Sequence, residues 1–240
     1  MDIKKRKNEI RKHVWDELES KDIATFPRPV HGRIPNFRGA DAAARKLTEL
    51  DEFKKAKTLK VNPDAPQRPV RYLTLCEKKL LVMPPPRLRS HLILLDPSMI
   101  PKNVLYKASA ISGAFTYSKT LALDSKFKVD LIVMGSVAVS TNGARLGKGE
   151  GYAELEYATL KTIGAIDDNI PVATTVHDIQ LVNDIPSEDH DVPVDIIITP
   201  SKVIRTKTTL AKPKGIIWEK VTDEMLAKMP ILRELKEKYG

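Results

Sequence analysis

The chain has 240 residues, of which 42% are hydrophobic and 30% charged, a balance typical of a globular protein with a sizeable core. No apolar run approaches the ~20 residues that a membrane-spanning helix needs, and the charged first 20 residues lack the apolar core of a secretory signal. A single cysteine excludes a disulfide framework and a cysteine-based zinc site. These features predict a cytoplasmic protein with no membrane partner.

The chain is strongly basic, with 40 Lys+Arg against 31 Asp+Glu and a formal net charge of +9. Such a balance favours anionic partners, either nucleotides, phosphorylated or polyglutamylated small molecules, or nucleic acid. A generally basic, solvated surface explains the same charge without a partner. Aromatic residues make up only 5% of the chain and do not alternate with basic ones, which weakens the case for RNA.

The first third of the chain is predicted to be helical with loops. Along residues 2–20, apolar or long side chains recur at intervals of about 3.6 residues, the period of a helix. The segment Phe26–Phe37 holds three prolines and a glycine and must be extended or turning. Asp41–Lys57 has the pattern of a second amphipathic helix. Residues 70–79 are predicted to form a short helix that opens at Pro69, with a strand as the alternative.

Short apolar runs then alternate with helical or loop segments, which is typical of strands buried on both faces. The alternation indicates βαβ units and predicts an α/β fold, with three layers (α/β/α) and a mostly parallel, Rossmann-like sheet. Met225–Tyr239 has the pattern of a C-terminal amphipathic helix. We expect one domain over residues 1–240, with N-terminal helices and a proline-rich loop (1–60), an α/β core (61–220) and a C-terminal helix (221–240). The predicted strands are Leu80–Met83, Leu92–Leu95, Asp130–Val139, Val172–Val176 and Val194–Thr199.

The segment Asp130–Tyr157 carries the strongest functional signal. In it an apolar strand leads into a glycine-rich loop, and a helix is expected to begin at about Tyr152. Glycines let a loop turn its backbone N–H groups inward at a helix N-terminus, and Arg145 and Lys148 add positive charge. The spacing matches neither GxGxxG nor a Walker A loop. These residues favour phosphate binding, with a tight turn as the alternative; the loop glycines are Gly143, Gly147, Gly149 and Gly151.

The sequence GARLGKGEGY at residues 143–152 is similar to the hallmark loop of the 5-formyltetrahydrofolate cyclo-ligases (methenyltetrahydrofolate synthetases), an RLG-basic-G-x-GYYD pattern. The strand DLIVMGSVAV and the later segment HDIQLVNDIPSEDHDVPVDIIITP match that family in order and spacing. The resemblance runs from about Lys4 to Pro200 and implies the family's α/β fold. The stretches FPRPVHGRIPNFRGA, GSVAVS and GKGEGYAELEYA, with the tail near Pro230–Arg233, resemble still more closely the N-terminal domain of methenyltetrahydrofolate synthetase domain-containing proteins.

The resemblance implies an ATP site. The cyclo-ligases reach the ATP phosphates with a Lys and an Arg four residues apart on an N-terminal helix, and Lys7 and Arg11 have this spacing. Without the family, a solvated basic face explains the pair. Arg145 and Lys148 are the implied catalytic residues, which offset charge on the phosphoryl group. The implied nucleotide-binding residues are Lys7, Arg11, Arg145, Gly147, Lys148, Gly149, Gly151 and Tyr152.

The resemblance also implies a magnesium site. Glu154 stands at the position of the YYD aspartate, and Asp191 lies in the late segment that supplies the family's second carboxylate. Two carboxylates together with phosphate oxygens and water suit Mg²⁺. The alternative for Glu154 is a solvated residue in the first helical turn. His190 and Asp195, in the same late segment, are expected to be structural. ATP and Mg²⁺ are thus the implied cofactors.

In that family, ATP phosphorylates the formyl oxygen of 5-formyltetrahydrofolate, the nitrogen at folate position 10 attacks the activated carbon, and phosphate leaves to give the 5,10-methenyl product. Several positions depart from the pattern. Ala153 and Glu154 replace Tyr and Asp of YYD, and Val139 stands where an aromatic residue would line the pterin site. Asp64 is the nearest candidate for the family's acidic substrate-binding residue. The phosphate-binding half is therefore retained and the folate half altered.

The sequence predicts a cyclo-ligase-like enzyme that uses ATP–Mg²⁺ to convert 5-formyltetrahydrofolate to 5,10-methenyltetrahydrofolate, or a related reaction on a small anionic substrate. The alternative is a non-catalytic nucleotide- or RNA-binding module on the same fold, with RNA held by the basic surface. The altered folate half and the net charge of +9 favour that alternative.

Overall fold

The structure is a computed structural model that describes residues 2–240, apart from the side chain of Pro86. One sheet has the order β10-β9-β8-β5-β1-β2-β3-β4, and a separate hairpin pairs β6 with β7. The strands are β1 (Thr58–Val61), β2 (Leu80–Met83), β3 (Ile93–Leu95), β4 (Lys119–Thr120), β5 (Leu131–Met134), β6 (Ala138–Val139), β7 (Arg145–Leu146), β8 (Val172–Thr175), β9 (Ile196–Ile198) and β10 (Val203–Arg205).

The centre of the sheet is parallel, as predicted. Strands β2, β1, β5, β8 and β9 all run the same way, while β3, β4 and β10 add antiparallel pairs at the two edges. The central strands are buried on both faces, which is why their sequences are nearly continuous apolar runs. The carboxyl ends of the parallel strands therefore meet at one edge of the sheet, the usual position of a ligand site in open α/β folds.

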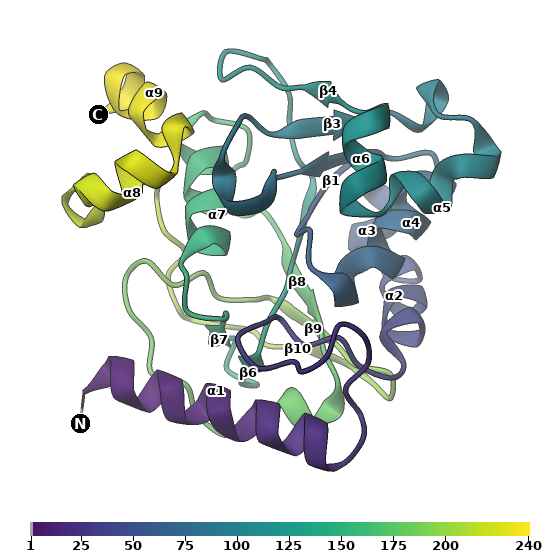
Figure 1. Cartoon of the computed structure of the whole chain (residues 1–240), viewed down its shortest axis with the longest axis vertical. Helices are drawn as coiled ribbons and strands as arrows, with labels where there is room; N and C mark the ends of the chain where they lie inside the picture. Colours follow the sequence, from purple (N-terminus) through teal and green to yellow (C-terminus); the bar gives the residue numbers. More distant parts are fainter. Residues whose placement is uncertain (1) are drawn as a thin grey trace.

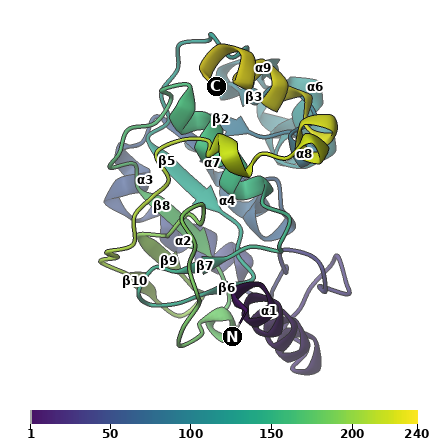
Figure 2. The ribbon, with the colours of Figure 1, turned by 90° about the vertical axis from the view of Figure 1, so that its left-hand side faces the viewer.

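Helices cover both faces of the sheet and give the predicted three layers (Figures 1 and 2). One face carries α2 (Ala40–Thr48), α3 (Asp51–Lys55), α4 (Arg68–Cys76), α5 (Leu105–Ala108) and α6 (Ile111–Tyr117). The opposite face carries α7 (Tyr152–Thr162), α8 (Asp223–Lys228) and α9 (Pro230–Tyr239). Short 3₁₀ turns lie at η1 (Ala65–Gln67), η2 (Pro86–Leu88), η3 (Pro97–Met99), η4 (Lys102–Val104), η5 (Asp178–Gln180) and η6 (Trp218–Lys220).

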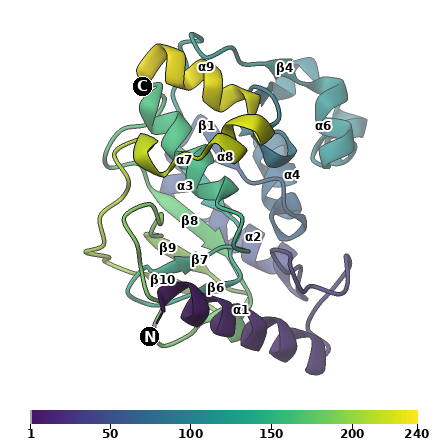
Figure 3. The ribbon, with the colours of Figure 1, turned by 60° about the vertical axis from the view of Figure 1, so that its left-hand side comes forward.

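The N-terminal helix α1 (Ile3–Ser20) stands apart from these layers. It crosses the end of the molecule beside the β6–β7 hairpin, as Figures 1 and 3 show. Its apolar side chains Ile10, Val14 and Leu18 pack against the hairpin and the proline-rich loop in a third, smaller core. The helix predicted over residues 2–20 is confirmed, although Ile3 is 41% exposed and takes no part in that core.

Alternation along β1 decides what each face of the sheet receives. Leu59 and Val61 point to the face covered by α2–α6 and are part of its core. Lys60 and Asn62 must then point to the opposite face, toward α7. Both are buried there, so a charged side chain lies beneath the apolar layer of α7.

Two predicted helices are each divided in two. The helix expected over Asp41–Lys57 breaks at Leu50, whose extended backbone (φ −76°, ψ 147°) separates α2 from α3 and lets Phe53 return to the core. The helix expected over Met225–Tyr239 breaks before Pro230, which lacks the N–H group that would continue α8. The helix predicted at residues 70–79 is confirmed as α4 and begins at Arg68.

The predicted strand Asp130–Val139 is also wrong in its second half. β5 ends at Met134, and the chain leaves the sheet at Gly135 before β6 begins. A side chain at position 135 would have its Cβ only 2.8 Å from Gln67 and from Ile34, so the exit passes through space that suits glycine. Leu80–Met83 is present with the predicted bounds, and the other predicted strands are present with shorter bounds. The central strand β1 was not predicted. No helix described here is long and apolar enough to cross a membrane.

Candidate active site

A cavity of about 1310 Å³ lies at the carboxyl ends of β1 and β5, between α1, α7 and the C-terminal segment. Residues Asn62–Asp64 after β1 and Gly135 after β5 line its inner end. Its walls, within the part of the chain that the structure describes, carry ten Lys or Arg residues against six Asp or Glu residues. The excess of positive charge suits an anionic ligand.

The glycine-rich loop forms one wall of this cavity, from Gly147 to Gly151 between β7 and α7. Gly149 (φ 98°) and Gly151 (φ 73°) adopt left-handed backbone conformations that favour glycine. A Cβ at Gly149 would lie 3.2 Å from the guanidinium carbon of Arg11, so the absence of a side chain lets the arginine approach the loop. α7 begins at Tyr152, as predicted, and no side chain among the described residues caps its first turn.

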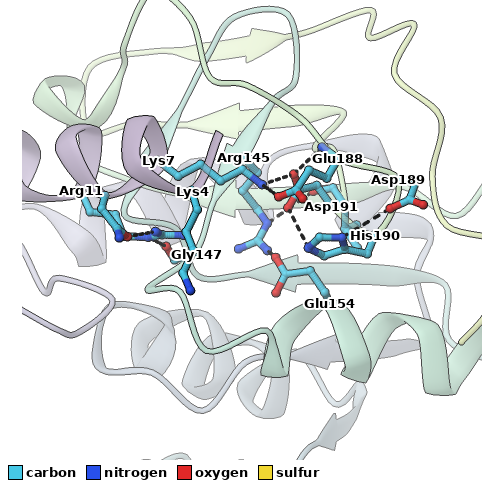
Figure 4. Close-up of polar contacts among 12 residues, drawn as sticks. Lys4, Lys7, Arg11, Arg145, Gly147, Glu154, Glu188, Asp189, His190 and Asp191 are labelled. Atoms are coloured by element: carbon cyan, nitrogen blue, oxygen red, sulfur yellow. Dashed lines mark hydrogen bonds and ion pairs between the residues drawn. The ribbon is translucent and has the colours of Figure 1, made fainter. Parts of the chain in front are cut away.

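Helix α1 contributes the predicted Lys7 and Arg11 from one buried face. Lys7 pairs with Asp191 and Glu188 (Figure 4), with Nζ 2.6 Å from Asp191 Oδ2 and 2.8 Å from Glu188 Oε2. Arg11 donates from Nε to the carbonyl oxygen of Gly147 at 2.7 Å. The helix is thus held against both the glycine loop and the late segment. We name this part of the cavity, formed by Lys7, Arg11, Gly147–Gly151, Glu188 and Asp191, the phosphate cradle.

Burial lowers the pKa of the Arg11 guanidinium, while the nearby carboxylates of Glu154 and Asp191 raise it in part. Lys148 in the glycine loop is partly exposed and pairs with Glu150 at 2.7 Å. The Lys148 side chain is therefore more accessible than Arg11 to a ligand in the cavity.

Arg145 occupies a different position from the one predicted. It belongs to strand β7 rather than to the loop, and its side chain is fully buried. It donates to the carbonyl oxygens of Gly135 at 2.7 Å and Val192 at 3.4 Å, and it pairs with Glu154. These bonds tie the exit of β5, the hairpin and the first turn of α7 together, so Arg145 fixes the position of the Glu154 carboxylate.

The two predicted magnesium ligands line the same cavity and come from separate elements. Glu154 lies in the first turn of α7 and Asp191 in the segment before β9. Each has a cationic partner, Arg145 for Glu154 and Lys7 for Asp191 (Figure 4). No group of three or more His, Cys, Asp or Glu side chains among the described residues could hold a metal ion alone. Two oxygen donors fit a hydrated Mg²⁺ that is also bound by ligand phosphates.

The C-terminal segment supplies a wall that the sequence did not predict. Seven residues between 213 and 225 line the cavity, and the Ile216 N–H donates to Oγ1 of Thr162, the last residue of α7, at 3.0 Å. Lys220 pairs with Asp189, and its Nζ lies 3.5 Å from His190 Nδ1, next to Asp191.

Asp195, expected to be structural, accepts a hydrogen bond from the Val172 backbone N–H at 2.8 Å.

The inner end of the cavity is lined by Asn62, Asp64 and Glu156, and Lys60 is buried behind them. Sequence reasoning named Asp64 but missed the other three, which are buried. We name this group, formed by Lys60, Asn62, Asp64 and Glu156, the cavity floor. Lys60 Nζ lies 2.5 Å from Glu156 Oε2, and Asn62 Nδ2 donates to the same oxygen at 2.7 Å. The alternation of Lys60 with apolar residues in TLKV was a weak sequence signal, since such alternation also occurs on solvated strands.

Asp64, the candidate for an acidic substrate residue, lies in the cavity just after β1. Burial raises the pKa of its carboxyl, while Lys148, Arg71 and Lys60 lower it in part. Arg71 donates to the backbone carbonyls of Asn62 at 2.5 Å and Asp64 at 3.0 Å and so fixes this loop. Burial lowers the pKa of Arg71 to about 9.

Val139, expected at the pterin site, is buried in the core beside α7 and is not among the residues that line the cavity. Its β6 position pairs with Arg145 in the hairpin. The missing aromatic side chain at this position therefore says nothing about the shape of the cavity.

A glycine-rich loop, a helix N-terminus and two carboxylates lie together at the carboxyl edge of a parallel sheet, where open α/β proteins place their ligand sites. The model of the 5-formyltetrahydrofolate cyclo-ligase family matches residues 3–200, and the chain belongs to this family of ligases. The resemblance seen in the GARLGKGEGY loop is thereby confirmed. Residues 201–240, with their cavity wall, lie outside the match.

Three similar proteins illustrate this relationship. A methenyltetrahydrofolate synthase domain-containing protein of Bos taurus is 52% identical over 235 residues, covering 96% of this chain but only 62% of the relative. A 5-formyltetrahydrofolate cyclo-ligase of Mycolicibacterium smegmatis is 32% identical over 77 residues, covering 32% of this chain and 37% of the relative. The NMR structure of Aquifex aeolicus 5,10-methenyltetrahydrofolate synthetase shares the fold, with a TM-score of 0.53, 23% identity, and coverage of 85% of this chain and 95% of that one.

Proposed function

We propose that this chain is an ATP- and Mg²⁺-dependent cyclo-ligase that converts 5-formyltetrahydrofolate to 5,10-methenyltetrahydrofolate or acts in a related way on a small anionic substrate. One observation carries the proposal: α1, the glycine loop and the segment 188–191 converge from distant parts of the chain on one cationic cavity. The family membership supports the reaction class.

The size of the cavity supports a reaction between two ligands. Small-molecule sites usually measure about 300–1,000 Å³, and this cavity, at about 1310 Å³, is larger. The phosphate cradle and the cavity floor lie in the same cavity, so a nucleotide and a second ligand can meet without crossing a barrier. Holding both reactants together supplies much of the rate gain in such transfers.

In the proposed complex, the N–H groups of the glycine loop and the first turn of α7 bind the ATP phosphates, with Lys148, Lys7 and Arg11 adding charge. Lys7 exchanges part of its pairing with Asp191 for a phosphate. Glu154 and Asp191 would hold Mg²⁺, which neutralises phosphate charge when bound. Arg145 holds Glu154 in place and adds to the positive field at the reacting phosphoryl group.

The proposed reaction moves the γ-phosphoryl group of ATP to the formyl oxygen of the substrate and releases ADP. The folate nitrogen at position 10 then attacks the activated carbon, and phosphate leaves as the five-membered ring closes. The chain provides no covalent nucleophile in this sequence. Its residues contribute position and charge.

The test is formation of methenyl-folate by the purified chain, followed by absorbance, with 5-formyltetrahydrofolate omitted in the control. We expect product only when ATP and Mg²⁺ are both present. Glu154→Gln and Asp191→Asn should remove the magnesium dependence of ATP binding, measured by calorimetry. Both variants should also lose some thermal stability, because each takes the charged partner from a buried cation, Arg145 or Lys7. Tight ATP binding without product would overturn the proposed reaction, and unaltered magnesium dependence in both variants would exclude this carboxylate pair.

A second candidate is a non-catalytic nucleotide- or RNA-binding module, favoured by the net charge of +9 and the Ala153–Glu154 departure from the family loop. The salt dependence of binding distinguishes the two candidate functions. Binding of RNA through surface cations should weaken steeply between about 50 and 200 mM salt, because phosphate contacts release counterions. A nucleotide in the enclosed cavity should lose much less affinity. Tight, sequence-selective RNA binding without ATP binding would favour the second candidate.

A further inference from the structure

The C-terminal segment presents apolar side chains to a cavity that is otherwise rich in charge. Ile217, Val221 and Met225 line this cavity, and all three are only partly buried. We name these three residues the apolar strip. Ile217 packs against none of the hydrophobic cores that the described residues form. Apolar side chains that remain accessible in a cavity wall gain free energy when a ligand covers them.

The segment that carries the strip is held in a fixed position. The Ile216 N–H donates to Thr162 Oγ1 at 3.0 Å, and the Ile216 side chain is buried in the core beside α7. Lys212 Nζ lies 2.6 Å from Asp195 Oδ2 and anchors the start of the segment. Helix α8, which carries Met225, lies beside α7 in Figures 2 and 3. Because these contacts order the segment before a ligand binds, covering the strip costs little conformational entropy.

The strip adjoins the phosphate cradle through two connections. Lys220, which lies within the same segment, pairs with Asp189, two residues before Asp191 of the cradle. Tyr152 and Ala153 follow the glycine loop directly, at the start of α7, and line the same cavity. A ligand whose phosphates occupy the cradle therefore has the apolar strip beside it.

We propose that the apolar strip binds the flat face of the nucleotide base, and that Ile217 and Val221 are specificity-determining residues for ligands that carry a base beside their phosphates. The inference rests on the proposed function, because ATP supplies such a base. The strip lies outside residues 3–200, the part of the chain that the family model matches, so the base is held by a segment that the family loop does not include. Ala153, in place of the tyrosine of the family loop, leaves space for a flat ring.

The test compares three probes by calorimetry on the full chain: ATP–Mg²⁺, inorganic tripolyphosphate–Mg²⁺, which has the phosphates without the base, and 5-formyltetrahydrofolate. Ile217→Ala and Val221→Ala should each weaken ATP binding about threefold to tenfold, because each variant removes two or three carbon atoms from the contact. Binding of the other two probes should change by less than about twofold. Val203→Ala, at an exposed position of the edge strand β10 outside the cavity wall, is the matched control and should change none of the three.

A second kind of variant fills the proposed space instead of enlarging it. Ala153→Tyr introduces a bulky ring in the first turn of α7 and should weaken ATP binding about tenfold, because the base and the new side chain compete for one space. Binding of tripolyphosphate should again stay close to that of the wild type. This second probe also shows, for every variant, that the chain is folded and the cradle intact.

Several outcomes would overturn the inference. One is a wild-type chain that binds ATP no more tightly than tripolyphosphate; another is wild-type ATP affinity in the Ile217, Val221 and Ala153 variants. Equal losses for ATP and tripolyphosphate would indicate a merely structural role, and a loss for 5-formyltetrahydrofolate alone would place the folate on the strip. If the wild-type chain forms methenyl-folate while any of these results holds, only this inference fails. If the wild-type chain binds neither ATP nor tripolyphosphate, the proposed function fails and this inference fails with it.

Discussion

The phosphate cradle and the cavity floor hold their charges in different ways. In the cradle, Lys7 pairs with Asp191 and Glu188 between a helix and a loop, next to the partly exposed Lys148. On the floor, Lys60 and Glu156 are buried between a strand and a helix. Charges near solvent exchange partners at small cost, whereas buried charges cannot lose theirs without a large penalty. In the cradle only Glu188 and the Lys148–Glu150 pair are exposed enough to exchange partners in this way, because Lys7 and Asp191 are nearly as buried as the floor pair. The exposed part of the cradle is therefore suited to binding and release, and the floor is held rigidly.

The largest expected effect comes from breaking the floor. Glu156→Ala leaves Lys60 as an uncompensated buried cation and should lower the free energy of unfolding by about 3–5 kcal/mol, measured by chemical denaturation. Glu150→Ala removes the partner of Lys148 in the glycine loop and is the matched control. It should change stability by less than about 0.5 kcal/mol. Equal losses in the two variants would remove the distinction between floor and cradle.

The next effect falls on nucleotide affinity. Lys148→Ala should weaken ATP–Mg²⁺ binding by about 1.5–3 kcal/mol, the value of a hydrogen bond to a charged group, with stability nearly unchanged. Arg145→Ala should show a similar loss of affinity but also a lower unfolding free energy, since its buried bonds to Gly135 and Val192 disappear. Calorimetry and chemical denaturation on the same samples distinguish the loss of ATP affinity from the loss of stability. Unchanged affinity in both variants would exclude the cradle as a phosphate site.

A smaller effect should appear in the pH dependence of stability. Because the pKa of Asp64 is raised in the folded chain, its carboxyl ionises at lower pH in the unfolded chain, and stability falls as pH rises through that interval. The Asp64→Asn variant has no carboxyl at this position and should not lose stability as pH rises. Its stability relative to the wild type should therefore increase from about pH 3 to about pH 7, as measured by thermal unfolding. A constant difference across that range would show that the carboxyl is not perturbed by folding.

The smallest effect is expected at the C-terminal wall. Lys220 and Asp189 are both substantially exposed, so Lys220→Ala should change the unfolding free energy by less than about 0.5 kcal/mol. The pair is expected to hold the segment beside Asp191, so the Lys220→Ala variant should bind ATP about twofold more weakly than the wild type in low salt. This difference should disappear in high salt, which screens the pair in the wild type. A stability loss as large as that of Glu156→Ala would contradict the view that exposed pairs contribute little.

The sequence was sufficient to predict the glycine loop because its signals are local: closely spaced glycines can be recognised without the fold, and α7 begins where they indicate. Lys7 and Arg11 were named only through the family resemblance, and Glu188, which pairs with Lys7, was not predicted. The floor could not be predicted, since Lys60 and Glu156 are 96 positions apart and meet only when β1 packs against α7. Position 145 was misplaced for a similar reason: nothing local shows that RL forms a strand with Ala138–Val139.

The same contrast explains which parts of the fold were predicted. Apolar runs predicted four of the five parallel strands, β2, β5, β8 and β9, because strands buried on both faces have little choice of residue. β1 was missed, since Lys60 interrupts the apolar run in TLKV. The breaks at Leu50 and Gly135 depend on packing against distant segments, and no turn residue marks Leu50. Pro230 is the exception, because a proline inside a helical pattern is a local signal that the interpretation of a single C-terminal helix did not use.

The contact between Lys7 and Asp191 also has a consequence for the newly made chain. The two residues are 184 positions apart, and ribosomes add about 5–20 residues per second, so α1 waits on the order of ten to forty seconds before its partner is made. For most of that interval the basic face of the helix has neither its acidic partners nor the glycine loop, which is made about 40 residues before Asp191. The group of charges around Lys7 is therefore completed only after residue 191 has been added.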